Sequence, residues 1–373
     1  MDALTTPLNW QRVRLGDIGK PCMCKRVMKH QTTRYGEIPF YKIGTFGNTA
    51  DAFISKKLFL EYKTKYSFPK KGDILISASG TIGRAVIYDG KPAYFQDSNI
   101  VWIDNDETLV KNDFLFYAYS NIKWNTEHTT ILRLYNDNFK NTLIPLPPLN
   151  EQIAIANILS DLDRYLYNLD ALILKKESVK KALSFELLSQ RKRLKGFNQN
   201  WQRVRLGDIA NYLTSSLSAE QITQQGKIKV YDANNFIGYT DTTFISDKPY
   251  ISIVKDGSVG RVRILPPKTN ILSTMGALIA NHKTTTEFLF YLLSNFDFKN
   301  FTSGSIIPHI YFKDYKEKTI FLPPLNEQIA IANILSDLDH EIISLKNKKR
   351  QFENIKKALN HDLMSAKIRV LKK

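Results

Sequence analysis

One segment, LPPLNEQIAIANILSDLD, occurs twice without a single difference, at residues 146–163 and 322–339. A shorter segment, NWQRVRLGDI, is also repeated, at residues 9–18 and 200–209. The order along the chain is short motif, variable block, long motif, and then the same again. We therefore expect two pseudo-equivalent halves related by an approximate two-fold axis, arranged like a circle that has been cut at one point.

Each long motif predicts the end of a strand followed by the start of a long helix. Its two prolines end the strand, and Asn150 and Asn326 suit the N-cap position of the helix. No proline or glycine interrupts residues 151–195 or 327–373. At 1.5 Å per residue each helix would be roughly 60–65 Å long, which is too long for the core of one small domain.

Apolar residues in both helices recur at alternating steps of four and three, interrupted in the second helix by Lys349 and Lys356. This heptad seam predicts a coiled coil. The pseudo-two-fold symmetry of the two halves predicts that the helices pack antiparallel and separate the variable blocks. An ordinary bundle helix is the alternative. The residues that we predict to pair the helices are Leu159, Leu162, Leu166, Leu169 and Ile173 in the first helix, and Leu335, Leu338, Ile342, Leu345, Phe352 and Leu359 in the second.

The variable blocks contain short strand-like runs such as GDILISASG and RVRILPP, each bounded by Gly, Pro, Asp or Asn. Short helices are expected at KNDFLFYAYSNI and TTEFLFYLLSN, and GTIGRAVI in the first block weakly matches GSVGRVRI in the second. We therefore predict an α+β chain in which two mixed α/β domains share one fold. The predicted boundaries are 1–145 and 200–321 for these domains, and 146–199 and 322–373 for the helical regions.

The charge balance is strongly basic, with 53 Lys and Arg against 36 Asp and Glu and a formal net charge of +17. Basic residues are spread along the whole chain, so a polyanion such as nucleic acid is the expected partner, and a merely soluble basic protein is the alternative. Cys22 and Cys24 lack the further ligands of a zinc site and are expected to be reduced thiols. With no leader-like start and no long apolar run, we expect a cytoplasmic protein.

The sequence lacks the common catalytic motifs of nucleic-acid enzymes. There is no phosphate-binding Gly-x4-Gly-Lys-Ser/Thr run, no Asn/Asp-Pro-Pro-aromatic motif of adenine methyltransferases and no Gly-rich S-adenosylmethionine loop. Asp51 with Glu61 and Lys63 could be drawn as a nuclease pattern, but these residues lie in a charged stretch typical of a solvated surface. We expect that the chain catalyses nothing alone and binds neither a cofactor nor a metal.

The doubled order of elements resembles the specificity subunit of type I restriction–modification enzymes over essentially the full chain. The residues that carry the resemblance are Pro147, Pro148, Leu149, Glu151 and Gln152, their copies Pro323, Pro324, Leu325, Glu327 and Gln328, and the motif openings at Trp10 and Trp201. The resemblance implies two target-recognition domains that bind a split sequence in double-stranded DNA. It also implies docking of two modification (methyltransferase) subunits, with restriction–translocation subunits in the full complex; those partners would use S-adenosylmethionine, ATP and Mg²⁺.

Physical reasoning agrees with this resemblance. A pseudo-two-fold protein presents its two domains to inverted half-sites, and because the blocks differ in sequence the half-sites should differ too. A strut of roughly 60 Å limits the separation of half-site centres to about 18 bp. The alternatives are a self-sufficient DNA methyltransferase or nuclease with divergent motifs, and a DNA-binding scaffold without sequence preference.

Candidate DNA contacts follow from residue type, because phosphates attract Lys, Arg and small polar groups, and base edges attract Arg, Lys, Asn, Gln, Ser and Thr. For each residue a solvated loop position is an equal alternative, and Gly80, Gly83, Gly257 and Gly260 are better explained as turn residues. In the first block the candidates are Lys25, Arg26, Lys29, His30, Arg34, Ser79, Thr81, Arg84, Thr129, Thr130 and Arg133. In the second block they are Lys227, Lys229, Ser258, Arg261, Ser303, Ser305 and His309.

Overall fold

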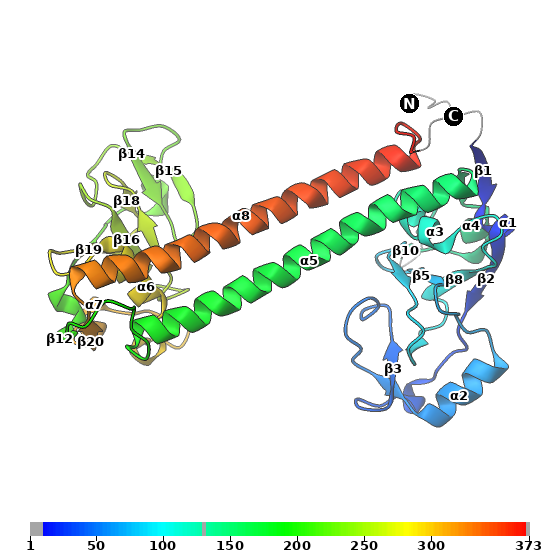
Figure 1. Cartoon of the computed structure of the whole chain (residues 1–373), viewed down its shortest axis with the longest axis horizontal. Coiled ribbons are helices and arrows are strands. Elements are labelled where there is room, and N and C mark those ends of the chain that lie inside the picture. Colours follow the sequence, from blue (N-terminus) through cyan, green and yellow to red (C-terminus); the bar gives the residue numbers. More distant parts are fainter. Residues whose placement is uncertain (1–9, 129–131, 371–373) are drawn as a thin grey trace. The chain divides into compact units, whose positions relative to one another are not determined.

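The computed structural model describes residues 10–128 and 132–370 and divides into two compact units (Figure 1). The first unit consists of the chain up to Leu169 together with residues from Lys348 onward, and the second consists of Asp170–Asn347. Two 40-residue helices, α5 (Leu149–Leu188) and α8 (Leu325–Met364), are each continuous. Each unit therefore holds one variable block, part of α5 and part of α8.

The first unit is built from short, mostly antiparallel strands. Their neighbour orders are β1-β11, β2-β8-β5-β6, β4-β3-β7 and β10-β9. The strands are β1 (Gln11–Arg14), β2 (Gly19–Met23), β3 (Ile38–Tyr41), β4 (Phe53–Ile54), β5 (Ile74–Ser77), β6 (Ala85–Ile87), β7 (Tyr94–Phe95), β8 (Ile100–Asn105), β9 (Glu127–His128), β10 (Leu132–Arg133) and β11 (Leu143–Leu146). The short helices are α1 (Leu15–Ile18), η1 (Lys29–Gln31), α2 (Lys56–Lys65), α3 (Asn112–Tyr119) and α4 (Asn136–Asn141).

The second unit repeats this topology. Its neighbour orders are β12-β20, β13-β19-β16-β17 and β15-β14-β18, which correspond strand by strand to the first three sheets of the first unit. The strands are β12 (Gln202–Arg205), β13 (Ala210–Thr214), β14 (Ile228–Tyr231), β15 (Phe236–Thr240), β16 (Tyr250–Val254), β17 (Val262–Leu265), β18 (Asn270–Ile271), β19 (Met275–Ala280) and β20 (Thr319–Leu322). The short helices are η2 (Leu206–Asp208), η3 (Ala219–Gln221), α6 (Thr286–Ser294), η4 (Lys299–Phe301) and α7 (Phe312–Tyr315). The expectation that the two variable blocks share a fold is confirmed.

Each unit has an apolar core that includes the ends of both long helices. In the first unit, Leu159 of α5 and Leu363 of α8 are buried in the same cluster as the four-stranded sheet and α3. In the second unit, Leu187 of α5 and Leu335 of α8 occupy the corresponding cluster. Leu159 and Leu335, which we predicted to pair the helices, therefore also form part of a domain core.

Contacts between α5 and α8 establish the direction of packing within each unit. In the first unit Lys356 pairs with Asp163, and the rings of Tyr165 and Phe352 lie 4.7 Å apart. In the second unit Lys346 pairs with Glu177 at 2.6 Å, and Lys180 pairs with Asp339. Residue numbers rise along one helix as they fall along the other, so the predicted antiparallel packing is confirmed. Lys356, which interrupts the apolar seam in the sequence, supplies one of these ion pairs.

The predicted N-cap residues are wrong, because each long helix begins before its asparagine. The helices begin at Leu149 and Leu325, so Asn150 and Asn326 lie inside the first turn. The carbonyl of Pro148 accepts hydrogen bonds from the amides of Glu151 and Gln152, which places the cap at the proline. The asparagine side chain accepts a bond from the amide of the next residue at 2.9 Å in both copies.

Candidate nucleic-acid interface

A buried glutamate near the start of each long helix joins three separate segments. Glu151 is 2% exposed; it accepts a hydrogen bond from Trp10 Nε1 at 3.1 Å and pairs with Arg369, whose Nε lies 2.6 Å from Oε1. The second unit has the same joint, in which Trp201 Nε1 donates to Glu327 at 2.9 Å and Arg193 pairs with the same carboxylate at 2.6 Å. Each joint ties the short motif to the start of one long helix and to the tail that follows the other.

The neighbouring glutamine fixes the variable block to the helix. Gln152 is fully buried; its Nε2 donates to the carbonyls of Leu109 and Pro147, and its Oε1 accepts from the amide of Lys111. Gln328 makes the equivalent bonds, donating to Lys283 and Pro323 and accepting from Thr285. In each unit a side chain of the long motif therefore holds the loop before α3 or α6.

A third set of contacts, after those of the glutamate and the glutamine, is made by the last residue of the long motif. Asp163 accepts a hydrogen bond from Tyr117 Oη of α3 at 2.8 Å and pairs with Lys356. Asp339 does the same with Tyr291 Oη of α6 at 2.9 Å and with Lys180. Burial and the adjacent carboxylate raise the pKa of both tyrosines, so each phenol stays protonated and donates.

In each unit a glycine turn lies beside the four-stranded sheet. It brings the candidate DNA contacts of the turn next to those of a second loop. Gly83 has φ +82° and Gly260 has φ +79°, and a Cβ at either position would collide with the ring of Trp124 or Phe298. The predicted turn role of these glycines is thus confirmed. A backbone bridge joins Ser79 to Arg133 in the first unit and Asp256 to His309 in the second, which places the second loop against the turn.

The turn of the first unit carries Thr81 and Arg84. Thr81 is exposed, and the Arg84 guanidinium donates to the carbonyl of Phe46 at 3.0 Å while much of its side chain remains exposed. Ser79, by contrast, is 6% exposed and donates to Asn99 Oδ1 at 2.8 Å. Its hydroxyl is thus bonded inside the protein, and we no longer count Ser79 among the DNA contacts. Thr129 and Thr130 lie outside the described residues.

The basic run Lys25–Arg34 is connected to this turn through residues 96–99. Arg26 Nε binds Asp97 at 2.8 Å, and Asn99, two residues further on, holds Ser79. Lys29 and His30 are exposed on η1, and Arg34 is exposed in the loop that follows.

In the second unit the corresponding surface contains a tight hairpin. Ser258 and Arg261 are exposed on the glycine turn. The backbone of Ser303 exchanges two hydrogen bonds with that of His309, at 2.9 and 2.8 Å. At the tip of this hairpin, after Ser305, two isoleucines that sequence reasoning missed are strongly exposed, Ile306 at 92% and Ile307 at 61%.

Lys227 and Lys229 lie away from this turn, on and just before β14. The Lys229 ammonium lies 5.9 Å from the centre of the Phe236 ring, and the amide of Lys227 donates to Asp241 at 3.0 Å. Their positions correspond to Glu37 and Pro39 of the first unit, so they are not counterparts of the basic run.

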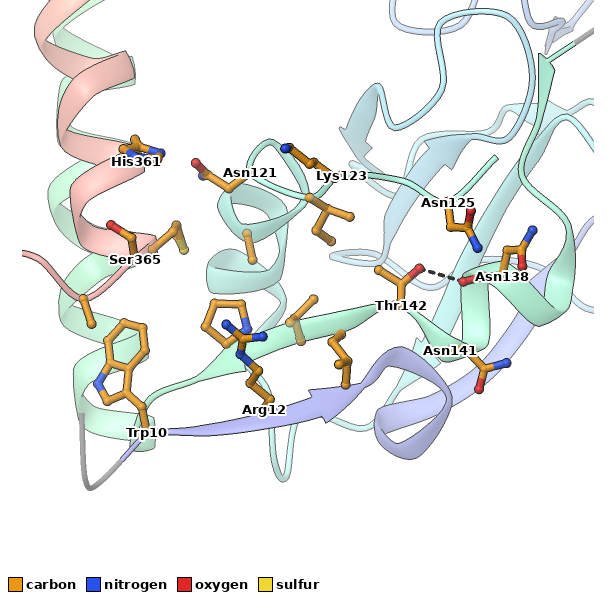
Figure 2. Close-up of a pocket in the computed structure, with 17 residues that line it drawn as sticks. Trp10, Arg12, Asn121, Lys123, Asn125, Asn138, Asn141, Thr142, His361 and Ser365 are labelled. Atoms are coloured by element: carbon orange, nitrogen blue, oxygen red, sulfur yellow. Dashed lines mark hydrogen bonds between the residues drawn. The ribbon is translucent and has the colours of Figure 1, made fainter. Parts of the chain in front are cut away.

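A cavity of about 610 Å³ in the first unit is lined by apolar side chains together with amides and cations. Figure 2 shows Arg12 on β1, Asn121 and Lys123 after α3, and His361 on α8 facing this space. Among the described residues no Asp or Glu lines it, so the cavity offers no carboxylate to a metal ion. The second unit has Asp297 where the first has Lys123, so the two units do not share this cavity chemistry.

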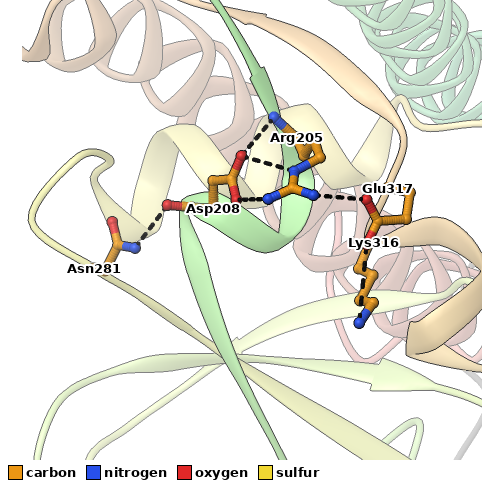
Figure 3. A network of polar contacts seen from close by, with 5 residues as sticks. All are labelled: Arg205, Asp208, Asn281, Lys316 and Glu317. Atoms are coloured by element: carbon orange, nitrogen blue, oxygen red, sulfur yellow. Dashed lines mark hydrogen bonds and ion pairs between the residues drawn. The ribbon is translucent and has the colours of Figure 1, made fainter.

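A polar network in the second unit marks another difference between the halves (Figure 3). Arg205 of the short motif binds both oxygens of Asp208, at 2.9 and 3.1 Å, and Glu317 at 3.0 Å. The guanidinium lowers the pKa of Asp208. The first unit has Asn141 at the position of Glu317, so the corresponding Arg14 lacks this carboxylate.

The nuclease pattern drawn from the sequence is not assembled. Asp51 pairs with Lys42 at 2.8 Å, Glu61 pairs with Lys65 at 3.1 Å, and the Lys63 ammonium lies over the rings of Phe59 and Phe68. Within the described ranges no three His, Cys, Asp or Glu side chains are grouped as metal ligands.

Cys24 lies in the core of the first unit, and Cys22 is partly buried against the same cluster. Cys24 is 2% exposed within an apolar cluster, and burial raises the pKa of its thiol to about 12. The thiol is therefore protonated at neutral pH, whereas a metal would bind the thiolate. None of the helices in the described part of the chain is long and apolar enough to cross a membrane.

The partners of the buried glutamates were also missed by sequence reasoning, although a signal was present. Arg193 and Arg369 occupy matching places in the basic tails that follow the two long helices. The two tails align at the same offset as the long motif and both are basic, but a basic tail does not show which carboxylate its arginine will bind.

Comparison with known proteins agrees with this geometry. The family model described as the type I restriction modification DNA specificity domain matches residues 7–176 and again 198–354. A type I restriction enzyme specificity subunit of Methanocaldococcus jannaschii is 26% identical over 99% of this chain and 95% of its own length. A putative specificity subunit of Haemophilus influenzae is 64% identical, but that match spans only 39% of this chain and 38% of the relative.

A crystal structure of the S subunit from M. genitalium shares the fold, with a TM-score of 0.64 at 21% identity and 98% of each chain covered. Specificity subunits are the non-catalytic members of type I restriction enzyme complexes. The double match covers most of the chain, and each match contains one variable block and most of the long helix that follows it. The chain therefore belongs to the type I restriction–modification DNA specificity subunits and carries the family's specificity domain twice.

Proposed function

We propose that the chain recognises an asymmetric, bipartite DNA sequence, with one half bound by each variable domain. The observation that supports this proposal is that the two variable domains share a strand topology but carry different side chains at equivalent positions. Arg133 and His309 occupy the same bridged position beside the glycine turn, so the two domains present different hydrogen-bonding groups to base edges. We take residues 1–145 and 200–321 as the recognition domains, with helical regions 146–199 and 322–373 setting a fixed spacing between half-sites.

Within each domain, the glycine turn and the loop bridged to it form the base-contacting surface. Thr81, Arg84 and Arg133 supply it in the first domain. Ser258, Arg261 and His309, with Ser303 and Ser305 on the hairpin, supply it in the second. These side chains carry the donor and acceptor groups that recognise bases in the major groove.

Exchange of recognition blocks tests this proposal. Residues 19–145 are replaced by the equivalent block of another family member, and methylated adenines are mapped across the genome of cells that carry the complex. We expect one half of the target to change and the other half, with the spacer, to stay. A change in both halves contradicts independent recognition.

We further propose that the repeated surface docks two copies of a methyltransferase subunit. Leu149 and Ile153 are 40% and 46% exposed at the start of α5, and Leu325 and Ile329 are 46% and 49% exposed at the start of α8. Identical exposed apolar side chains in both units are what two copies of one partner require. Restriction–translocation subunits would complete the complex, and S-adenosylmethionine, ATP and Mg²⁺ would be bound by these partners.

Docking is tested with Ile153→Arg and Ile329→Arg, alone and together. We expect each single variant to retain one methyltransferase subunit and the double variant to retain none, measured by mass photometry of the purified complex. The matched controls are Leu174→Arg and Ile343→Arg, which change residues 63% and 55% exposed on the same helices but outside the repeated segment. Loss of partners only in the controls would place the docking surface elsewhere.

A self-sufficient enzyme is the second candidate, and a direct assay separates it from the first. The purified chain is incubated with DNA and labelled S-adenosylmethionine without partner subunits. We expect no transfer of label, and methylation by the chain alone would contradict the assignment of catalysis to partners.

A further inference from the structure

Two loops with the same backbone carry opposite charge in the two recognition domains. The first is residues 25–34 and the second is residues 215–224. Met28 N donates to Gln31 Oε1 at 2.8 Å in the first, and Ser218 N donates to Gln221 Oε1 at 2.9 Å in the second. The two loops therefore close their 3₁₀ turns with the same side-chain bond.

The ends of the loops are also held alike. The backbone of Thr33 exchanges hydrogen bonds with Phe53, at 2.9 Å in both directions. The backbone of Thr223 exchanges the same pair of bonds with Tyr239, at 3.0 and 2.8 Å. These contacts fix the residue-by-residue correspondence of the two loops, so their exposed positions can be compared directly.

At those exposed positions the side chains differ completely in charge. Residues 25–34 include four Lys or Arg and no acidic residue, whereas residues 215–224 include one acidic residue and no Lys or Arg. Lys25, Arg26, Lys29, His30 and Arg34 stand where the second loop has Ser215, Ser216, Ala219, Glu220 and Gln224.

The cations of the first loop are available to a ligand. The Arg26 side chain is 67% exposed although it binds Asp97, and the Lys25 ammonium lies 5.1 Å from the centre of the Tyr66 ring. Across the described part of the chain, Lys29 and Arg34 make no ion pair with protein carboxylates. A cluster of exposed, largely uncompensated cations attracts a polyanion.

The position of the basic loop indicates that the polyanion is DNA. Asp97, which holds Arg26, and Asn99, which holds Ser79 at the start of the glycine turn, belong to one four-residue segment. The basic loop is thus anchored to the same segment as the surface that we assign to base contacts. Phosphates of the same DNA duplex lie beside any base that this surface contacts.

We propose that loop 25–34 binds the DNA backbone at the first half-site, and that loop 215–224 makes no equivalent contact at the second. This inference rests on the proposed function, because it requires that both domains bind DNA. Its consequence is that the salt-dependent part of the affinity comes mainly from the first domain. Each phosphate neutralised by a cation contributes about 0.9 to the slope of log affinity against log salt concentration.

The test transplants charge between the loops in the complex with methyltransferase subunits. Lys25→Ser, Lys29→Ala and Arg34→Gln are combined, which gives the first loop the residues of the second; Arg26 is kept because it holds Asp97. The reciprocal variant combines Ser215→Lys, Ala219→Lys and Gln224→Arg. Affinity for the cognate duplex is measured over a range of salt concentrations.

We expect the first variant to flatten the salt slope by about 2–3 and the reciprocal variant to steepen it by a similar amount. Over a fourfold change in salt, a slope difference of that size corresponds to roughly 20- to 60-fold in relative affinity. An unchanged slope in the first variant overturns the proposal, and the reciprocal gain cannot arise from misfolding.

A charge-matched control removes three lysines of α2 instead, by Lys56→Gln, Lys57→Gln and Lys65→Gln. An equal flattening in this control overturns the proposal, because net charge alone would then explain the effect. Failure of the proposed function is recognised separately: the unaltered complex would bind cognate and scrambled duplexes equally, whatever the salt slopes of the variants.

Discussion

The two units share the buried polar contacts of the long motif but differ in the charge of two corresponding exposed loops. Glu151 and Glu327 accept the same bonds from a tryptophan and an arginine, and Gln152 and Gln328 hold the same loop. Loops 25–34 and 215–224, in contrast, share hydrogen bonds but not charge. The Glu and Gln contacts that join the long motif to each domain are therefore repeated, whereas the two exposed loops leave the domains free to bind different partners.

The largest expected effect comes from the glutamate joints, which we predict to be equivalent. Glu151→Gln should lower the free energy of unfolding of the first unit by about 3 kcal/mol, because it leaves Arg369 without its carboxylate. Glu327→Gln should cost the second unit a similar amount. Hydrogen-exchange mass spectrometry of each variant measures where protection is lost.

The control for these variants is Glu353→Gln, which removes a carboxylate that is 51% exposed and should change stability by less than about 1 kcal/mol. The predicted equivalence is contradicted if one of the two glutamate variants keeps full stability. It is also contradicted if either variant reduces hydrogen-exchange protection equally in both units.

A smaller effect is expected at the glycine turns, where the two units should differ in degree. A Cβ at Gly83 would lie 2.0 Å from Trp124 Nε1, and a Cβ at Gly260 would lie 2.7 Å from Phe298 Cδ2. Gly83→Ala should therefore cost roughly 2–3 kcal/mol and Gly260→Ala somewhat less. Denaturant unfolding followed by circular dichroism measures both.

Gly257→Ala is the matched control, because Gly257 has φ +85° with no atom within 4 Å of a Cβ. It isolates the backbone strain, about 1–2 kcal/mol, from the steric clash. Equal losses in all three variants would show that the aromatic ring makes no contribution.

The smallest expected effect concerns the hairpin tip of the second unit. Ile306→Ser combined with Ile307→Ser should weaken binding of the cognate duplex about tenfold by removing apolar contact with bases. Because neither residue is charged, the salt slope should not change. Fluorescence anisotropy at several salt concentrations measures both quantities, with Ile343→Ser as the control for loss of an exposed isoleucine. A weaker salt slope with unchanged preference for the cognate sequence would contradict a base contact.

Sequence reasoning was most successful where a periodic pattern or a repeat determined the outcome. The heptad spacing predicted that the long helices pack together, and the doubled order of motifs predicted their antiparallel direction. The glycines predicted the paired turns, because a turn depends on local geometry. The bonds of Glu151 and Gln152 were not predictable, since their partners lie up to 218 residues away in the chain. The burial of Ser79 was not predictable for the same reason, because a serine in a turn sequence gives no sign that its hydroxyl will bind Asn99.

The division of the long helices between the units has a consequence for synthesis. The second unit is one uninterrupted stretch, Asp170–Asn347, whereas the first needs residues from Lys348 onward. The core of the first unit includes Leu363 and Met364, which follow the whole of the second unit in the chain. The domain whose chain leaves the ribosome first is therefore the last to complete its core, and a nascent chain that stops short of these residues leaves the earlier domain, not the later one, unfinished.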